Sequence, residues 1–503
     1  MSQSQPVMMD GNRPNILVIM TDEHRWDCVG TYGNNEVLTP HIDMLAQDGV
    51  RFENCFTCAP LCTPARYSFL TGLYPHQHLG WNNRSTMMPG LATFPKILKT
   101  HGYETTAVGK MHFNPPYLDV GIDSMHLAEQ DGDGRYVDSY HRGLKSLGLL
   151  DAVDLMDQVS EFRAVAPDKY WETMGALQSN LPEYAHSTSW IGKRAVEELE
   201  KWTDFRSHLL FVSFIKPHHP FDPAPPWSSM YDPKSLNLLP GWTDECLTRD
   251  IDFDKGYFPH LELEVQKMQQ ILAYYYADIS HIDDYVGEML EVLHRKQLYD
   301  NTLVIFTSDH GDYMGFHHLL LKSNYMYDPV IRVPLIIKFP QSFQMGTQNL
   351  EMVSSIDVCP TILASVGLND SSHFPGMDLL KIARGESRRT HILAESEQGH
   401  QVVIRTTDYK WIRTLHGELM FDLRNDPYEY TDISASDDYQ EIKSDLKLSL
   451  LETLLSCPPQ VYKGEIHTEI DCEERTLGAA EEPVMRDWSR KMFANWLNLQ
   501  REL

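Results

Sequence analysis

Three cysteines stand within eight positions of the chain, at Cys55, Cys58 and Cys62 in the segment CFTCAPLCTPARYSFLTG. Thiolates at this spacing could hold zinc or an iron–sulfur cluster, form a disulfide, or include one reactive group. A metal cage needs a fourth ligand, and no second closely spaced cysteine pair follows in the sequence. We therefore expect Cys55 and Cys58 to be small buried residues and Cys62 to be reactive, with the metal cage as the alternative.

The residues after Cys62 indicate what surrounds its side chain. Thr-Pro-Ala-Arg is followed by YSFLTG, an apolar helical start, so the pattern predicts a helix that begins beside Cys62. Backbone N–H groups at a helix N-terminus favour negative charge, and Arg66 lies one turn further on. The sequence thus predicts a position at residue 62 that stabilises an anion.

Ionisable residues follow four of five apolar runs in the chain. The runs are NILVIM (15–20), TTAVG (105–109), LLFVSFI (209–215), TLVIFT (302–307) and VPLIIKF (333–339). The first four are followed by TDEH, KMH, KPHH and SDHGD. Short runs rich in β-branched residues, separated by helical patterns, predict buried strands of a mostly parallel or mixed sheet. Since ligands bind beyond the carboxyl ends of such strands, we expect an active site at that edge.

The remaining patterns predict the architecture. Apolar residues recur at three- and four-residue steps from Leu263 to Leu298, which predicts a long helix. Strands that alternate with helices predict an α/β fold, a large sheet flanked by helices. After about residue 395, QVVIRTTDYKWIRT and ELMFDLRNDPYEYTD predict antiparallel strands. We predict a catalytic domain over 1–395 and a smaller α+β subdomain over 396–503, with an antiparallel sheet and a helical tail.

Composition limits the class of protein and its partners. The 503 residues are 42% hydrophobic and 23% charged, as in globular proteins. The net charge of -28 opposes binding of nucleic acid, so an anionic substrate would need a local basic cluster. No apolar run approaches the length of a membrane span, so we expect no membrane partner. With eight cysteines and no export signal visible, we expect a reduced, cytoplasmic protein, or a periplasmic or secreted one if a leader has been removed.

The segment Cys62-Thr63-Pro64-Ala65-Arg66 resembles the Cys-x-Pro-x-Arg signature of the type I sulfatases, in the alkaline phosphatase superfamily. Further stretches agree in the family's order over roughly residues 14 to 430: PNILVIMTDEHRWDCVGTYGN, GYETTAVGKMH, IKPHHPF, TSDHGDYMGFHHLLLK and FDLRNDPYE. The resemblance implies an alkaline phosphatase-like fold and hydrolysis of a sulfate ester. It also implies a partner, a formylglycine-generating or sulfatase-maturating enzyme, which oxidises Cys62 to formylglycine.

The same resemblance implies a role for each matched residue. Residue 62, as a hydrated aldehyde, would be the nucleophile and would also contact a divalent ion, Ca²⁺ with Mg²⁺ as the alternative. The other implied ligands are Asp22, Glu23, Asp309 and His310, where Glu23 replaces an aspartate common in the family. Arg66 and Lys110 would hold the nucleophile, and His112 would be the base that releases sulfate. His218 and Lys322 would bind sulfate oxygens, and His218 would protonate the leaving alcohol.

The substrate is less closely defined by the sequence. We expect a sulfated carbohydrate, as a small molecule or an oligosaccharide, with aryl or small alkyl sulfates as alternatives. The residues expected at the substrate rim are Trp81, Asn82, Asn83, Arg84, Tyr117 and His219, and the loop DGDGRYVD (131–138) is expected at the mouth of the site. A phosphonate monoester or phosphodiester hydrolase is the nearest alternative, and a non-catalytic metal-binding protein is another. The tail at 484–503 could pack on a second copy and form a homo-oligomer.

Overall fold

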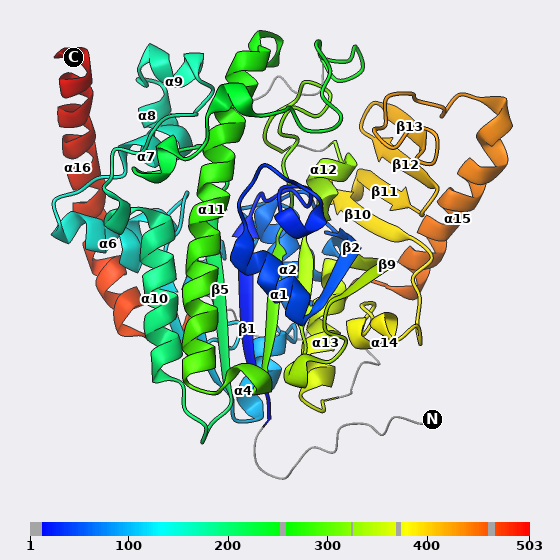
Figure 1. Ribbon diagram of the computed structural model, residues 1–503, viewed down its shortest axis with the longest axis horizontal. Helices are drawn as coiled ribbons and strands as arrows, with labels where there is room; N and C mark the ends of the chain where they lie inside the picture. The colour runs from blue at the N-terminus through cyan, green and yellow to red at the C-terminus, as the bar shows by residue number, and fades with distance from the viewer. Residues whose placement is uncertain (1–12, 252–257, 323–324, 369–373, 461–467, 503) are drawn as a thin grey trace.

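The computed structural model describes residues 13–251, 258–322, 325–368, 374–460 and 468–502 (Figure 1). Residues 1–12, on which the expected absence of an export signal depends, lie outside the described residues. In the described part of the chain, no helix combines the length and the apolar character needed to cross a bilayer. All eight cysteines lie in described segments, and none of them forms a disulfide.

A nine-stranded sheet forms the centre of the molecule, in the order β4-β3-β5-β1-β6-β8-β2-β7 with β9 paired to β2. The strands are β1 (Asn15–Asp22), β2 (Val50–Phe56), β3 (Glu104–Gly109), β4 (Ser124–Leu127), β5 (His208–Pro217), β6 (Thr302–Ser308), β7 (Arg332–Val333), β8 (Leu335–Lys338) and β9 (Thr347–Ser354). The strands from β4 to β6 are parallel, whereas β8 is antiparallel to β6 and β2. The predicted α/β fold with a mixed sheet is confirmed. The run at 333–339 divides into β7 and β8 on either side of Pro334, which has no backbone N–H to donate.

The two faces of the sheet are covered by different helices. Alternate side chains of β1 point to opposite faces, so Ile16 and Val18 pack with one cluster and Leu17 and Ile19 with another. The first cluster includes residues of α2 (Cys62–Thr71), α4 (Phe94–Thr100) and α13 (Val358–Ser365). The second includes residues of α1 (Pro40–Asp48), α10 (Ser187–Lys201) and α11 (Val265–Arg295), the long predicted helix (Figure 1). Burial on both faces explains why the sequence of β1 is continuously apolar.

Shorter helices join these elements. They are α3 (Pro75–His78), α5 (Gly134–Val137), α6 (Ser139–Ser146), α7 (Ala152–Gln158), α8 (Ser160–Arg163), α9 (Asp168–Glu172), α12 (Asp328–Ile331) and α14 (Leu379–Ala383). The segments around α5 to α9 follow β4 and lie on the same side of the molecule as α10 (Figure 1).

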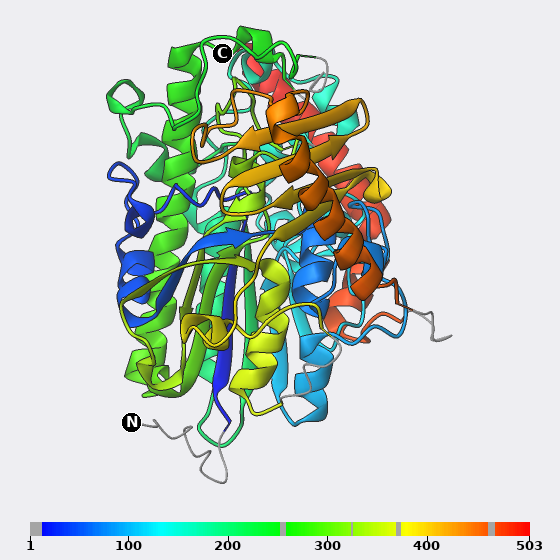
Figure 2. The same cartoon turned by 90° about the vertical axis from the view of Figure 1, so that its right-hand side faces the viewer.

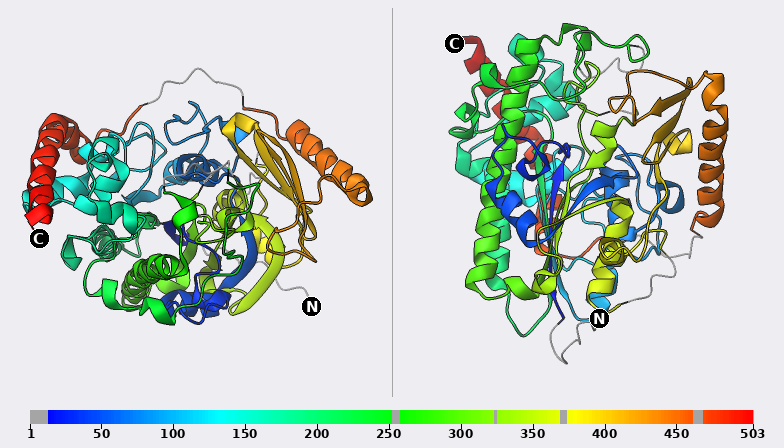
Figure 3. Two further views of the ribbon diagram at one scale, coloured as in Figure 1. Left: turned by 90° about the horizontal axis from the view of Figure 1, so that it is seen from above. Right: turned by 45° about the vertical axis from the view of Figure 1, so that its right-hand side comes forward.

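A second, four-stranded antiparallel sheet follows in the order β10-β11-β12-β13. It consists of β10 (Ile392–Ser396), β11 (Gln401–Arg405), β12 (Tyr409–Thr414) and β13 (Gly417–Asp422), and α15 (Gln440–Ser456) packs on its outer face (Figure 2). The last helix, α16 (Glu473–Glu502), lies on the opposite side of the molecule from α15 (Figure 3). Its Phe493 packs against Phe162 of α8, so the tail contacts its own chain. A contact between this tail and a second copy stays a prediction.

A buried ion network joins the small sheet to the rest of the protein. Asp328, in α12, accepts from Lys410 at 2.9 Å and from Arg405 at 2.9 Å. Lys410 also pairs with Glu429 at 2.8 Å, and Glu429 accepts the backbone N–H of Asp328 at 2.9 Å. Burial alone would raise the pKa of Asp328, but Arg405 and Lys410 hold it well below its usual value. The carboxylate is therefore ionised and its charge is paired across the interface.

Replacement of Asp328 by asparagine should destabilise the protein by about 3 kcal/mol, because it leaves the charge of Arg405 buried without its partner. The free energy of unfolding is measured by guanidinium denaturation followed by circular dichroism. Asp438→Asn, a change at an exposed aspartate, serves as the control and should leave the midpoint unchanged. An Asp328→Asn midpoint equal to that of wild type would contradict this account of the interface.

Candidate active site

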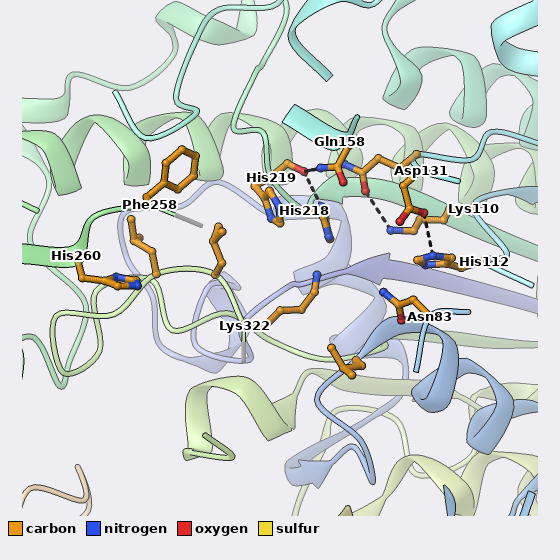
Figure 4. A pocket seen from close by; sticks show the side chains of 14 residues that line it. Asn83, Lys110, His112, Asp131, Gln158, His218, His219, Phe258, His260 and Lys322 are labelled. Atoms are coloured by element: carbon orange, nitrogen blue, oxygen red, sulfur yellow. Dashed lines mark hydrogen bonds and ion pairs between the residues drawn. The ribbon is translucent and has the colours of Figure 1, made fainter. Parts of the chain in front are cut away.

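A pocket of about 280 Å³ opens beyond the carboxyl ends of the parallel strands (Figure 4). The strand register aligns the carboxyl ends of neighbouring strands, since Met20 of β1 pairs with Ser213 of β5 and with Thr307 of β6. Gly109 of β3 also pairs with Ser213. The pocket is lined by Leu61, Asn83, Lys110, His112, Gln130, Asp131, Gln158, His218, His219, Phe258, His260, Leu320, Leu321 and Lys322. The strand ends that the sequence identified therefore meet at one place.

Four buried residues at the base of this site could share one metal ion. They are Asp22, Cys62, Asp309 and His310, and their candidate ligand atoms all lie within 4.8 Å of one another. The Cys62 Sγ lies 3.6 Å from Asp22 Oδ1 and 3.3 Å from His310 Nε2. His310 Nδ1 donates to the Gly311 carbonyl at 2.9 Å, which leaves Nε2 facing the group. Two carboxylates and an imidazole are suitable ligands for a divalent cation.

The pKa shifts of Asp22 and Asp309 also support a site for a divalent cation. Burial and the neighbouring charge of Asp22 raise the pKa of Asp309 to about 6. Burial would also raise the pKa of Asp22, but Lys110, His218 and Arg66 hold it well below its usual value. Two adjacent buried carboxylates repel each other, and a cation between them would relieve this repulsion. The donor set and its charge therefore fit a divalent ion.

Helix α2 begins at Cys62, as the sequence predicted, and it presents Arg66 on the same side of the helix. The Arg66 guanidinium donates from Nε to Asp309 at 2.9 Å and from Nη2 to Asp22 at 3.0 Å. Its Nη1 donates to the Lys110 carbonyl at 2.5 Å and to Ser213 Oγ at 2.8 Å. Arg66 is thus fixed at every nitrogen, and it holds both carboxylates beside residue 62.

The three clustered cysteines have different environments. Burial and Asp22 would raise the pKa of the Cys62 thiol, but Lys322, Lys110 and His310 hold it well below its usual value. Burial raises the pKa of Cys58 to about 11 and raises that of Cys55 as well. Among the described residues, the metal-ligand groups include Cys62 but neither of the other two cysteines. The geometry therefore favours one reactive cysteine over a three-cysteine metal cage.

His112 and Lys110 extend from the end of β3 into the pocket. The Lys110 ammonium pairs with Asp22 at 2.8 Å and donates to Gln130 at 3.1 Å. His112 has a positive φ of 55°, and the buried Glu129 accepts its backbone N–H at 3.0 Å. His112 Nε2 lies 3.0 Å from an Asp131 carboxylate oxygen. Burial would lower the pKa of His112, but Asp131 raises it to about 10.

Glu23 forms a second cluster next to the first. Its Oε2 lies 3.2 Å from Lys322 Nζ, 3.3 Å from His218 Nε2 and 3.2 Å from His219 Nδ1. Burial would raise the pKa of Glu23, but Lys322 and His219 bring it down to about 2. The structure places this carboxylate beside Lys322 and two histidines, outside the four-residue group around Cys62. Direct ligation of the metal ion by Glu23 stays a prediction.

Only some of the residues expected at the substrate rim line the pocket. Asn83 and His219 line the pocket, as does Asp131 from the loop expected at its mouth. Trp81, Asn82 and Arg84 precede or follow Asn83 without being part of the lining. Tyr117 is only 1% exposed and packs in the hydrophobic cluster beneath the sheet, so its expected place at the rim is wrong.

Several lining residues were not identified from the sequence. Gln130 connects two parts of the site, because it accepts from Lys110 and its Nε2 donates to the His219 carbonyl at 2.7 Å. Gln158, Phe258, His260, Leu320 and Leu321 also line the pocket. Gln130, Gln158, Phe258 and His260 come from helix ends and loops with no chemical motif of their own. Leu320 and Leu321 lie within the quoted stretch TSDHGDYMGFHHLLLK, but leucines carry no signal of a binding role.

Comparisons with known proteins agree with this arrangement. The profile of the family described as Sulfatase matches residues 14–368, and the profile of the N-sulphoglucosamine sulphohydrolase C-terminal region matches residues 315–455. An arylsulfatase of Clostridium perfringens is 29% identical, over 88% of this chain and 94% of its own. An N-acetylglucosamine-6-O-sulfatase of Bacteroides thetaiotaomicron is 27% identical, over 90% of this chain and 88% of its own. The crystal structure of a phosphonate monoester hydrolase of Agrobacterium radiobacter shares the fold, with a TM-score of 0.73 and 23% identity over 88% of this chain and 95% of that one.

Ca²⁺ added to metal-free protein should raise the melting temperature, because it neutralises the buried carboxylate pair only in the folded state. At a concentration 100 times its Kd, an ion adds about 2.7 kcal/mol of stability. Asp309→Asn should remove this response, whereas Asp131→Asn, at a carboxylate outside the four-residue group, should keep it. Differential scanning calorimetry with Ca²⁺, Mg²⁺ or EDTA measures the shift. An Asp309→Asn protein that responds like wild type would show that the ion binds elsewhere.

Proposed function

The chain belongs to the sulfatase family and is a sulfuric ester hydrolase, and from this premise we propose that it removes sulfate from a sulfated carbohydrate. The proposal includes conversion of Cys62 to formylglycine and a divalent ion, Ca²⁺ or Mg²⁺, as cofactors. The observation that carries it is the buried group of Asp22, Asp309, His310 and residue 62, with cationic side chains above it. This is the charge distribution that hydrolysis of an anionic ester requires.

The base of the site has the groups needed to activate a nucleophile. A formylglycine at residue 62 and a divalent ion held by Asp22, Asp309 and His310 would supply a hydroxyl nucleophile and neutralise charge on the sulfate. Arg66 keeps the two carboxylates in place through its bonds to both. Lys110 lies beside residue 62, where its ammonium can contact a sulfate oxygen while it remains paired with Asp22.

Two histidines that line the pocket, His218 and His112, are candidates for proton transfer. His218 Nδ1 contacts the His219 carbonyl at 2.5 Å, and since a carbonyl only accepts, Nδ1 carries a hydrogen and Nε2 faces the pocket. Burial, Lys322 and His219 hold the pKa of His218 well below its usual value, so the resting ring is neutral and Nε2 must gain a proton, which the negative charge of a bound sulfate ester would favour, before it can protonate the leaving alcohol. Asp131 contacts His112 and raises its pKa to about 10, so His112 must first lose this proton before it can act as the base that releases sulfate.

The lining supports a carbohydrate as the leaving group. A volume of about 280 Å³ suits one sugar ring with its sulfate, at the small end of ligand pockets. Asn83, Asp131 and Gln158 offer hydrogen bonds for hydroxyl groups, while Phe258 and Leu320 offer apolar contact. The relative from Bacteroides thetaiotaomicron is named for a sulfated sugar, which is consistent with this substrate class.

Co-expression with a formylglycine-generating enzyme should modify the tryptic peptide Phe52–Arg66 at Cys62. The peptide mass should fall by the difference between a thiol and an aldehyde, and the peptide should react with a hydrazine probe. The Cys62→Ala protein, made in the same way, is the control and should stay unmodified and inactive. An active enzyme whose Cys62 remains a thiol would refute this chemistry.

The modified enzyme should hydrolyse N-acetylglucosamine 6-sulfate with a higher kcat/KM than ethyl sulfate, because the sugar fills the pocket. It should also hydrolyse 4-nitrophenyl sulfate faster than 4-nitrophenyl phenylphosphonate. Both esters release the same alcohol, so this comparison isolates the effect of the group transferred. Initial rates with each ester measure these ratios. Faster turnover of the phosphonate would instead favour a phosphonate monoester hydrolase.

A further inference from the structure

Lys216 is a buried cation that the proposed chemistry does not use. It lies at the end of β5, two residues before His218, and only 2% of its surface is exposed. Its ammonium forms an ion pair with Asp222, which is fully buried. Burial would lower the pKa of Lys216, but Asp222 and Asp278 raise it, so the side chain is charged. A buried charge is costly to desolvate unless counter-charges and hydrogen bonds compensate it.

The ammonium of Lys216 binds the backbone of the loop that carries His218. It donates to the His218 carbonyl at 3.3 Å and to the Pro220 carbonyl at 2.6 Å. The carbonyl between them, that of His219, accepts from Gln130 at 2.7 Å and from Gln158 at 3.2 Å. Three consecutive carbonyls are therefore fixed by side chains of the protein interior.

This backbone arrangement, together with the Glu23 carboxylate 3.3 Å from Nε2, sets where the His218 ring points. The ring is held through Nδ1 by the His219 carbonyl, and the peptides on either side of that carbonyl are held by Lys216. Movement of either peptide would break the contact at Nδ1 and turn Nε2 away from the pocket. A lysine ammonium can serve both carbonyls and a carboxylate at once because it has three donors and no acceptor.

We propose that Lys216 is a positioning residue, which fixes the loop at 216–222 so that His218 Nε2 faces the leaving oxygen of the ester. The inference rests on the proposed function, in which His218 protonates the leaving alcohol. Lys216 itself does not line the pocket and touches no reacting atom. Its effect should therefore depend on how much the leaving alcohol needs a proton.

Lys216→Met tests this dependence with two esters that share the sulfate group. Ethyl sulfate releases a poor leaving group that needs a proton, whereas 4-nitrophenyl sulfate releases a stable phenolate. General acid catalysis typically contributes about 10²- to 10⁴-fold, so we expect the ratio of kcat/KM for ethyl sulfate to that for 4-nitrophenyl sulfate to fall about 100-fold. Weaker sulfate binding or partial unfolding would lower both values together and leave the ratio unchanged, which would overturn the inference.

Lys338→Met is a matched control. Lys338 is also fully buried and donates to the Thr302 carbonyl at 3.1 Å, but it lies near the amino end of β6, whereas the pocket is at the carboxyl ends of the parallel strands. Its replacement should lower the melting temperature without changing the ratio. If Lys216→Met fails to fold because Asp222 is left unpaired, the double variant Lys216→Met/Asp222→Asn removes that charge and should show the same change in ratio.

The position of His218 can also be measured without turnover. In protein labelled with ¹⁵N-histidine, the hydrogen-bonded Nδ1–H signal of His218 is assigned by its loss in His218→Ala. We expect this signal in wild type and Lys338→Met and its disappearance in the Lys216→Met variants. Persistence of the signal in those variants would overturn the inference. Wild-type protein that hydrolyses no sulfate ester would refute the proposed function, and the signal would still decide the role of Lys216.

Discussion

The structure depends on one electrostatic constraint, the burial of two carboxylates next to each other. Asp22 ends β1 and Asp309 follows the adjacent parallel strand β6, and the strand register brings them together where no solvent can screen their charges. Cations from other elements surround them, Arg66 from α2 and Lys110 from the end of β3. The position of α2, and with it that of residue 62, follows from this need for compensation.

A second cluster of polar and charged side chains, centred on the carboxylate of Glu23, lies beside the first. Lys322, His218 and His219 converge on the carboxylate of Glu23, so the ammonium of Lys322 has an anionic partner before any ligand arrives. These contacts preorganise the three side chains at the pocket. They also explain how a chain with a net charge of -28 can offer an anion a favourable site.

The sequence predicted the centre of the fold better than its edges. β1, β5 and β6 are buried on both faces and contain continuous apolar runs, whereas alternate residues in the first part of β9 face solvent and its polar residues conceal the strand. Strand ends also predicted the site, because parallel strands bring their last residues together. Gln130 and Gln158 could not be identified, since only the three-dimensional path of the helices after β4 brings them to His219. Tyr117 was misplaced because its aromatic ring, adjacent to Leu118, packs into the core.

The burial of Cys62 has a consequence for the order of events during synthesis. The side chain is 1% exposed, and α7 and α8, near the pocket wall, pack against α16 from the end of the chain. If Cys62 is converted to formylglycine as we propose, the modifying enzyme would have to reach it before this burial is complete. At roughly 5–20 residues per second, synthesis of the about 440 residues that follow Cys62 in this sequence takes roughly 20–90 s. Modification and folding would then compete for this interval, and slower synthesis would favour a larger modified fraction.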